Sequence, residues 1–557
     1  MMRNVFWVTF GLLLVGCNNE NQLVGDEEPD ALFTMDNPAP AAYLRQGMVD
    51  VSGLAEGLRE VTVDGVAATI AEDGTWATEV AMARGVNIVE GRGVDTLGNA
   101  LYLRHGVLAG DFADPSNPVE DAMAVRVNEG GLEEIFDLVG DMITDDALAP
   151  TIAAANPVYE NAFSLGGFDA ATIEASITGL YFDRLSIYAD PQLDKMFVEV
   201  WIPNLFVSLN ASGEIIVWPY SEDAYIWADR VEIGGDITLD AAEGHLVADF
   251  SNSTVSLVGF GYDTSLIPSD IESWLFIDAV TLLLEDMLSD LIDEQLPALL
   301  EEQLSTLDIS FETELMGRNL TVSADFSDAS IDEKGVAIGM NLDIDIPGQT
   351  SHPYAGYLSA NGAAPHVDQS SDLAVALSDD LLNKVLFEAW QSGLLAMALS
   401  TDDGSLDPLM LAPLHADQGT ITIDAKLPPV IVESNNGLHA QMAELEITIE
   451  TPGGEMGEYI TLAVAAFIDV ELRVTDSVLK LDLGTPDLQL VVRDSDWGAS
   501  NEATTALLEE MLPVDLLTSL LGEIEFPIPS LGGLVIDHAT VQRDSSGVHT
   551  GVRVSLH

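Results

Sequence analysis

Residues 196–220 read MFVEVWIPNLFVSLNASGEIIVWPY, and apolar side chains alternate with polar ones along most of this stretch. A period of two is typical of a β-strand with one buried and one solvated face. Similar alternation occupies residues 173–189, 224–241 and 245–260. Together the four stretches predict a long antiparallel sheet with one wet face.

Helical patterns flank these strands. After a short strand at 124–127, one face of a predicted helix carries Leu132, Ile135, Phe136, Val139 and Ile143. A second helix is predicted from an N-cap at Ser269 to about Leu304, kinked or divided at Pro297. It is apolar on well over half of its circumference, which exceeds one amphipathic seam. Its apolar residues include Leu275, Ile277, Val280, Leu282, Leu284, Leu288, Leu291 and Ile292.

The second half of the chain repeats this order, which indicates a duplicated architecture. A strand at 373–377 precedes a helix that is capped by Ser378. Alternating strands follow, then a helix from about Asn501 to Ile524 and two closing strands. The apolar residues of the capped helix are Leu381, Leu382, Val385, Leu386, Ala389 and Trp390.

Nearer the N-terminus, short β-like runs are separated by Asp64-Gly65 and Asp73-Gly74, which suit tight turns. Trp76 is predicted to anchor the core of this region, and Asp95 to cap a turn rather than bind a ligand. The series resembles the immunoglobulin-like modules of exported bacterial proteins. The resemblance implies a β-sandwich over residues 41–112 that acts as a spacer.

Cys17, the only cysteine, follows an apolar run at 5–15 that is too short to span a bilayer. This pattern resembles the bacterial lipobox, which implies that Cys17 is acylated and that residues 1–16 are a removed signal peptide. Such a chain would be anchored to the outer membrane, on its periplasmic or cell-surface face. The alternative is an ordinary signal peptide with an incidental cysteine. Residues 17–40 are rich in Asn, acid and Pro and predict a flexible tether.

The chain carries 93 acidic and 19 basic residues, for a formal net charge of −74. This charge repels phosphate backbones, so nucleic acid is excluded as a partner. Hydrophobic residues make up 47% of the sequence, enough for substantial cores. Neither a catalytic motif nor a metal-binding loop is recognisable, so we predict no enzyme activity, no cofactor and no metal.

Three phrases resemble the lipid-binding serum glycoprotein family, which includes bactericidal/permeability-increasing protein, lipopolysaccharide-binding protein and cholesteryl ester transfer protein. They are VRVNEGGL at 125–132, LSDDLLN at 377–383 and EFPIP at 525–529. The resemblance covers about 430 residues and implies two elongated barrels of twisted antiparallel sheet, joined by a shared central sheet near 310–372. It also implies one lipid in each barrel, with its acyl chains between helix and sheet.

Two departures from this family restrict the function. The disulfide that braces the first barrel in relatives is absent, and so is their basic tip for lipid A. Membrane killing is therefore not carried over, and a neutral or zwitterionic lipid suits the charge better. An anionic headgroup would need local pairing with a residue such as Arg126, Arg184 or Arg230.

The predicted fold class is therefore α+β, with two barrels that hold long apolar helices and an N-terminal all-β immunoglobulin-like domain. The N-terminal lipid-binding barrel is predicted at 119–310, the central sheet and connection at 311–372 and the C-terminal lipid-binding barrel at 373–557. The predicted lipid contacts are Leu132, Ile135, Phe136, Val139, Ile143, Leu275, Ile277, Leu284, Leu288, Leu381, Leu382, Val385, Leu386 and Trp390.

These predictions describe a membrane-anchored lipoprotein that binds phospholipid or another apolar ligand and passes it between membranes. The alternative is an adhesin or structural spacer whose barrels are solid. Protein partners are not predicted.

Overall fold

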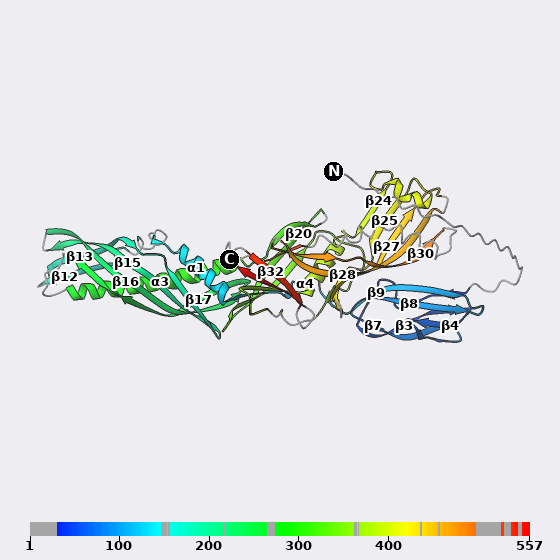
Figure 1. Cartoon of the computed structure of the whole chain (residues 1–557), viewed down its shortest axis with the longest axis horizontal. Helices are drawn as coiled ribbons and strands as arrows, with labels where there is room; N and C mark the ends of the chain where they lie inside the picture. Colours follow the sequence, from blue (N-terminus) through cyan, green and yellow to red (C-terminus); the bar gives the residue numbers. More distant parts are fainter. Residues whose placement is uncertain are drawn as a thin grey trace. The chain divides into compact units, whose positions relative to one another are not determined.

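Figure 1 shows the computed structural model of the chain. It describes residues 31–145, 153, 156–165, 168–215, 218–264, 273–315, 317–360, 365, 367–434, 437–454, 457–475, 477–496, 525–528, 536–543 and 549–556. The signal peptide, Cys17, the N-cap at Ser269 and the helix predicted at 501–524 lie outside these residues.

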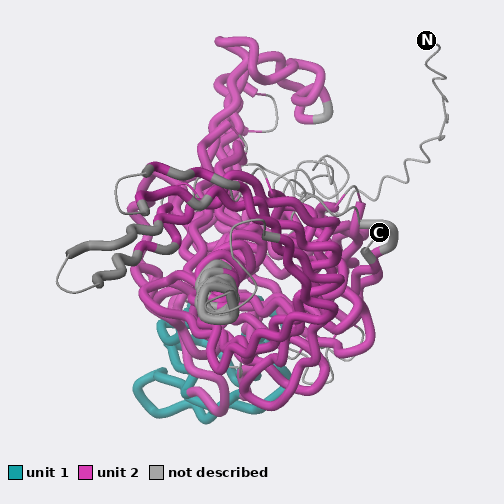
Figure 2. The backbone as a smooth tube through the Cα atoms, turned by 90° about the vertical axis from the view of Figure 1, so that its left-hand side faces the viewer, with its two compact units in different colours: residues 1–38, 50–80, 90–103 teal, residues 39–49, 81–89, 104–557 magenta. Residues whose placement is uncertain are grey.

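The chain divides into two compact units, which Figure 2 distinguishes by colour. Unit 1 comprises residues 1–38, 50–80 and 90–103, and unit 2 comprises residues 39–49, 81–89 and 104–557. The predicted immunoglobulin-like region therefore contributes strands to both units.

The strands of this region form two sheets. The first contains β1 (Leu32–Phe33), β3 (Gly47–Glu56), β7 (Thr75–Met82) and β6 (Thr69–Ile70). The second contains β2 (Tyr43–Leu44), β9 (Ala100–Ala109), β8 (Gly85–Asp95), β4 (Leu58–Val63) and β5 (Val66–Ala67).

Within unit 1, Trp76 is buried beside Phe33, with ring centroids 5.8 Å apart. The ring of Phe33 also packs over Gly93 of the facing sheet, where a Cβ atom would approach it to 3.3 Å. The Asp95 carboxylate accepts hydrogen bonds from the Leu97 and Asn99 amides at 2.8 and 2.7 Å, which confirms the predicted turn cap. The predicted tether was too long, because Phe33 is in a paired strand and is buried.

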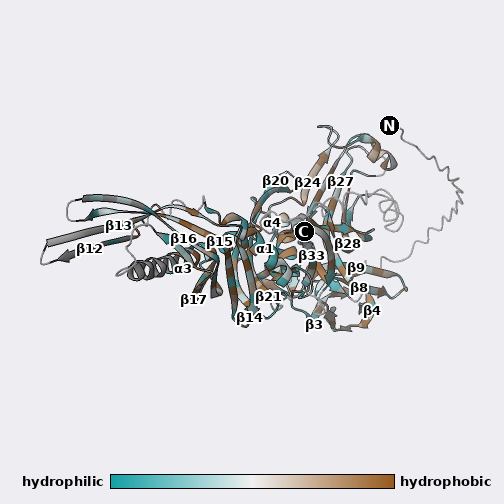
Figure 3. Ribbon diagram, turned by 60° about the vertical axis from the view of Figure 1, so that its left-hand side comes forward, coloured by the Kyte–Doolittle hydropathy of each residue, from teal (hydrophilic) through white to brown (hydrophobic). Residues whose placement is uncertain are grey.

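The first lobe of unit 2 is built on a seven-stranded antiparallel sheet. Its path is β12 (Tyr159–Leu165), β13 (Phe168–Tyr181), β15 (Lys195–Ile215), β16 (Trp218–Ala242) and β17 (His245–Val258). β14 (Ser186–Gln192) pairs with β15, and β18 (Gly261–Thr264) pairs with β16. Figure 3 shows apolar and polar positions alternating along the coloured parts of β15, β16 and β17, as the sequence predicted.

Two helices pack against the inner face of this sheet. They are α1 (Glu129–Met142) and α3 (Ser273–Ser305), and α3 runs along the sheet in Figure 1. Pro297 lies inside α3 without dividing it, so a division of this helix was wrongly predicted. Of the helices that the structure describes, none has the length and apolar composition needed to cross a bilayer.

A central seven-stranded sheet follows, in a strand order that the sequence did not predict. The order is β19 (Phe311–Leu315), β20 (Arg318–Asp332), β21 (Gly335–Asp345), β11 (Val119–Asn128), β23 (Leu373–Ser378), β33 (His549–Leu556) and β32 (Ile536–Arg543). The predicted sheet at 310–372 is thus completed by strands from outside this range. β22 (Tyr357–Ser359) pairs instead with β10 (Asp111–Ala113).

The second lobe has an eight-stranded sheet and one described α-helix, α4 (Asp379–Gln391). The Ser378 hydroxyl accepts from the Asp380 amide, which confirms the predicted N-cap. The strands are β24 (Ala396–Ser400), β25 (Thr420–Ala425), β26 (Val430–Ser434), β27 (Gly437–Glu450), β28 (Tyr459–Thr475), β29 (Val478–Leu483), β30 (Asp487–Ser495) and β31 (Glu525–Pro527). A 3₁₀ segment, η1 (Pro408–Leu414), connects β24 to β25. The described chain is thus mostly β-sheet, with less helix than predicted.

Candidate functional site

The predicted lipid contacts on α1 lie together on the face that points into the first lobe. Every one of them is buried, from Val139 at 0% to Ile143 at 5% exposed. They belong to the same apolar core as the inward residues of β15, such as Met196 and Val200. The helical pattern of this face was therefore predicted correctly, and its neighbours are protein atoms.

Helix α3 enters the same core through one stripe in its second half. The stripe has a spacing of four residues and is almost completely buried, and it consists of Leu288, Ile292, Leu296, Leu300 and Leu304. The side chains of the other predicted contacts, Leu275, Ile277 and Leu284, lie outside what the structure describes. Leu288 is thus the one predicted α3 contact that the structure places, and it is a core residue.

The predicted contacts on α4 are also packed within protein. Leu381, Leu382, Val385, Leu386 and Trp390 are between 0% and 3% exposed. The indole Nε1 of Trp390 donates to the Ala425 carbonyl at 2.7 Å, which fixes the ring.

The same helix buries polar side chains that the sequence analysis did not identify. Lys384 is 1% exposed, and its ammonium donates to the carbonyl of Pro115 and to Glu388 Oε1, the latter at 2.7 Å. Burial raises the pKa of Glu388, and the Lys384 charge opposes this shift. Asn383 donates to the carbonyl of Ile431 and accepts from its amide at 3.1 and 2.7 Å. The spacing of four residues between Lys384 and Glu388 was the available signal for this ion pair.

This burial has a consequence for ligand binding. A side chain that lines a cavity wide enough for an acyl chain keeps surface that a water molecule could reach. The described candidates on α1 and α4 have almost none. An acyl chain at these residues would have to displace protein atoms from a close-packed core.

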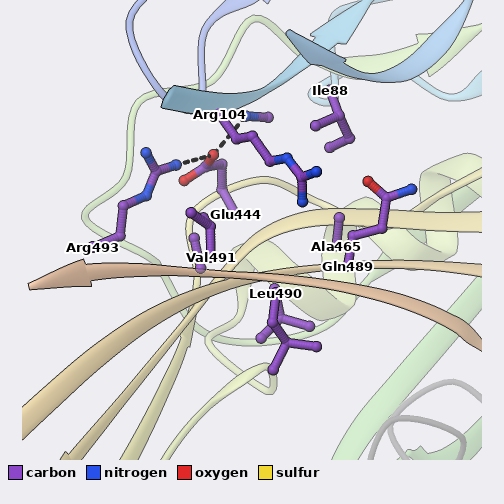
Figure 4. Close-up of a pocket in the computed structure, with 11 residues that line it drawn as sticks. Ile88, Arg104, Glu444, Ala465, Gln489, Leu490, Val491 and Arg493 are labelled. Atoms are coloured by element: carbon purple, nitrogen blue, oxygen red, sulfur yellow. Dashed lines mark hydrogen bonds and ion pairs between the residues drawn. The ribbon is translucent and has the colours of Figure 1, made fainter. Parts of the chain in front are cut away.

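A pocket lies elsewhere in unit 2, on the outer face of the second lobe (Figure 4). Its enclosed space is about 20 Å³, roughly enough for one water molecule, and it is partly open to solvent. Ala463 and Ala465 of β28, with Gln489 and Val491 of β30, form one wall. Ile88, Arg104 and Gly106 of β8 and β9 line the opposite side.

Glu444 is the central polar group of this pocket. It occupies a bulge in β27, has a φ of +51° and is 7% exposed. Its Oε1 accepts from Arg493 Nη2 and from the Gly106 amide, each at 2.6 Å. Arg104 reaches into the space beside Glu444 in Figure 4. Arg493 pairs with Glu444 in this lining, and Arg104 adds a second guanidinium group to it.

This site could not be predicted from the sequence, because its members come from five strands, several of them far apart along the chain. A local signal was the break in apolar alternation between Met442 and Leu445, because one extra residue in a strand is typical of a bulge.

The three arginines considered for an anionic headgroup are all ion-paired. Arg126 is buried and bonds to Asp332 and to Asn128 Oδ1. Arg184 bonds to Asp141, and Arg230 bonds to Glu232.

Comparisons with known proteins complete this description. No protein-family model matches the chain, and no curated protein matches it. The chain is similar to the crystal structure of lipopolysaccharide binding protein, with a TM-score of 0.38 and 14% identity over 79% of this chain and 99% of that one. It is also similar to the solution structure of latherin, with a TM-score of 0.15 and 21% identity over 31% of this chain and 75% of that one.

Proposed function

We propose that this chain is a membrane-anchored lipoprotein that binds lipid in its first lobe, with the acyl chains against the first half of α3. Cys17 carries the anchor, and the tether that follows it lets the folded part reach the lipid. The bound molecule is a neutral or zwitterionic lipid, in keeping with the acidic charge. Binding needs no chemical reaction, so the chain acts as a carrier and not as an enzyme.

The observation that supports this location is the composition of α3 beyond its core stripe. The buried stripe from Leu288 to Leu304 packs the second half of the helix into the core of the lobe. In the first half, the sequence WLFIDAVTLLL at 274–284 is apolar at all but two positions. Apolar residues at successive positions place apolar side chains on all sides of a helix. One stripe of core contacts shields only one of these sides from water, so the others need further apolar contacts. An acyl chain supplies that cover, at about 0.8 kcal/mol per buried methylene.

Crosslinking with a phospholipid that carries a photoreactive acyl chain tests this proposal. The mature full-length chain is loaded with a diazirine-labelled phospholipid, irradiated and digested, and the labelled peptides are sequenced. We expect label in the peptide that contains residues 273–287 and little in the peptide that contains α4. Label that is spread over exposed loops, or absent, would contradict the proposal.

The alternative, an adhesin or spacer with solid lobes, is favoured by one observation. The predicted contacts that the structure describes are all buried in protein. Native mass spectrometry of protein purified without added lipid separates the two functions. A mass that organic solvent lowers indicates a carrier, and a bare polypeptide mass indicates a spacer.

A further inference from the structure

The outer face of the first-lobe sheet carries a row of exposed aromatic side chains. The strand register places Tyr181 of β13 directly opposite Phe206 of β15, and Phe206 directly opposite Trp227 of β16. These three side chains are between 38% and 54% exposed. Residues directly opposite each other in an antiparallel sheet lie on the same face, so the three rings form one row across three strands.

The packing around this row is specific. Phe206 stacks on Tyr225 of the neighbouring strand, with ring centroids 5.7 Å apart and an interplanar angle of 23°. Trp227 faces Gly261 of β18, where a Cβ atom would lie 2.5 Å from the indole. The glycine therefore leaves room for the indole to lie over the next strand.

The aromatic surface continues along β15. Trp201 contacts Tyr188 of β14 at 4.7 Å between ring centroids, and the guanidinium of Arg230 lies 4.4 Å from the Trp201 ring. Phe197, further along the same strand, is 40% exposed. We call the full set the outer aromatic face, and it consists of Tyr181, Tyr188, Phe197, Trp201, Phe206, Tyr225 and Trp227.

The charges around this face are negative. Between residues 127 and 317 the sequence contains three basic side chains, Arg184, Lys195 and Arg230, and each forms an ion pair with a carboxylate. Exposed carboxylates of Asp183, Asp229 and Asp263 adjoin the aromatic row. The face thus combines apolar rings with a field that attracts cations and repels anions.

We propose that the outer aromatic face docks on a bilayer of zwitterionic lipid whose headgroups carry a quaternary ammonium. Tyr and Trp side chains suit the boundary between headgroups and acyl chains, because each has an apolar body and a polar tip. An ammonium headgroup is attracted both to aromatic ring faces and to the surrounding carboxylates. Anionic lipid is disfavoured, because the positive charges of these strands are already paired. This contact is separate from the anchor at Cys17 and from the lipid proposed inside the lobe.

Vesicle flotation tests this surface. The mature full-length chain with Cys17→Ser, which cannot be acylated, is mixed with phosphatidylcholine vesicles or with vesicles that contain phosphatidylglycerol. We expect flotation with phosphatidylcholine and weaker flotation as phosphatidylglycerol increases. The double variant Phe206→Ser/Trp227→Ser should lower the bound fraction roughly tenfold at limiting lipid.

Two further variants distinguish a docking surface from a folding defect. Tyr102→Ser removes an aromatic residue that is 57% exposed outside this face, and it should float like the parent chain. Tyr181→Ser changes a residue near the end of β13, and it should weaken flotation with an unchanged circular dichroism spectrum. Equal flotation of parent and double variant, or a preference for phosphatidylglycerol, would overturn the proposal. Retention on an insoluble polysaccharide without binding to vesicles would also overturn it and identify the occupant as a glycan.

Discussion

Replacing Lys384 with methionine tests the packing of α4. Lys384 is almost completely buried, and its ammonium lies 2.7 Å from the Glu388 carboxylate. Methionine has a similar length and fills much of the same space, but it leaves Glu388 without a cation. Removing one partner of a buried ion pair costs about 3–5 kcal/mol. At about 1.4 kcal/mol per factor of ten, even the lower value changes the opening equilibrium of the helix by roughly a hundredfold.

Hydrogen exchange followed by mass spectrometry measures this change locally, which suits a chain with several lobes. At pH 7 we expect the amides of α4 to exchange roughly a hundredfold faster in Lys384→Met. The difference in exchange rate between Lys384→Met and the wild type should shrink as the pH falls toward about 4. Since the pKa of Glu388 is raised in the folded state, that state then binds the extra proton and gains stability relative to the unfolded chain.

Two controls make the result specific to the ion pair. In Lys384→Met/Glu388→Leu both charges of this pair are replaced by apolar side chains, and we expect exchange close to that of the wild type. Lys334→Met removes an exposed lysine and should change stability by less than about 0.5 kcal/mol. A single Lys384→Met variant that exchanges like the wild type, or a double variant that exchanges as fast as the single one, would refute the reasoning.

Three other changes have expected outcomes. Asp332→Asn removes the carboxylate that pairs with the buried Arg126, and urea unfolding should show a loss of about 1–3 kcal/mol at pH 7. Because Arg126 lowers the pKa of Asp332, the contribution of this carboxylate is present above about pH 4 and fades as the pH falls further; a difference between the proteins that stays constant down to pH 2 would contradict this. Gly261→Val should displace the indole of Trp227 and shift its fluorescence emission to longer wavelength, and an unchanged spectrum would count against the packing described. Ser378→Ala removes the N-cap of α4 and should cost about 1 kcal/mol, measured by exchange of the first-turn amides, whereas Ser378→Thr should retain most of the cap.

Local signals in the sequence predicted the α-helices α1, α3 and α4 and many of the strands that the structure describes. The periodicity of the apolar residues fixes the buried face of α1, and the cap at Ser378 fixes the start of α4. Both depend on residues within a few positions of each other, so they can be recognised without knowledge of the fold.

Features that depend on distant residues were not predictable in this way. The sequence does not show that β11 pairs with both β21 and β23, because strand partners are selected by tertiary packing. A lysine inside a helix is normally assigned to the solvent face, so the burial of Lys384 was missed. An apolar helix face has the same sequence pattern whether it packs against protein or lipid. The residues of α1 and α4 that were predicted to contact lipid are therefore buried in the protein core instead.

The central sheet has a consequence for the order of assembly. β11 lies between β21 and β23, and β23 pairs in turn with β33, which is more than four hundred residues further along the chain than β11. Synthesis therefore delivers the first strand of this sheet long before its later ones. Until β33 arrives, β23 has an open edge that can pair with another chain, so truncation before residue 549 should yield aggregates and not a smaller soluble protein.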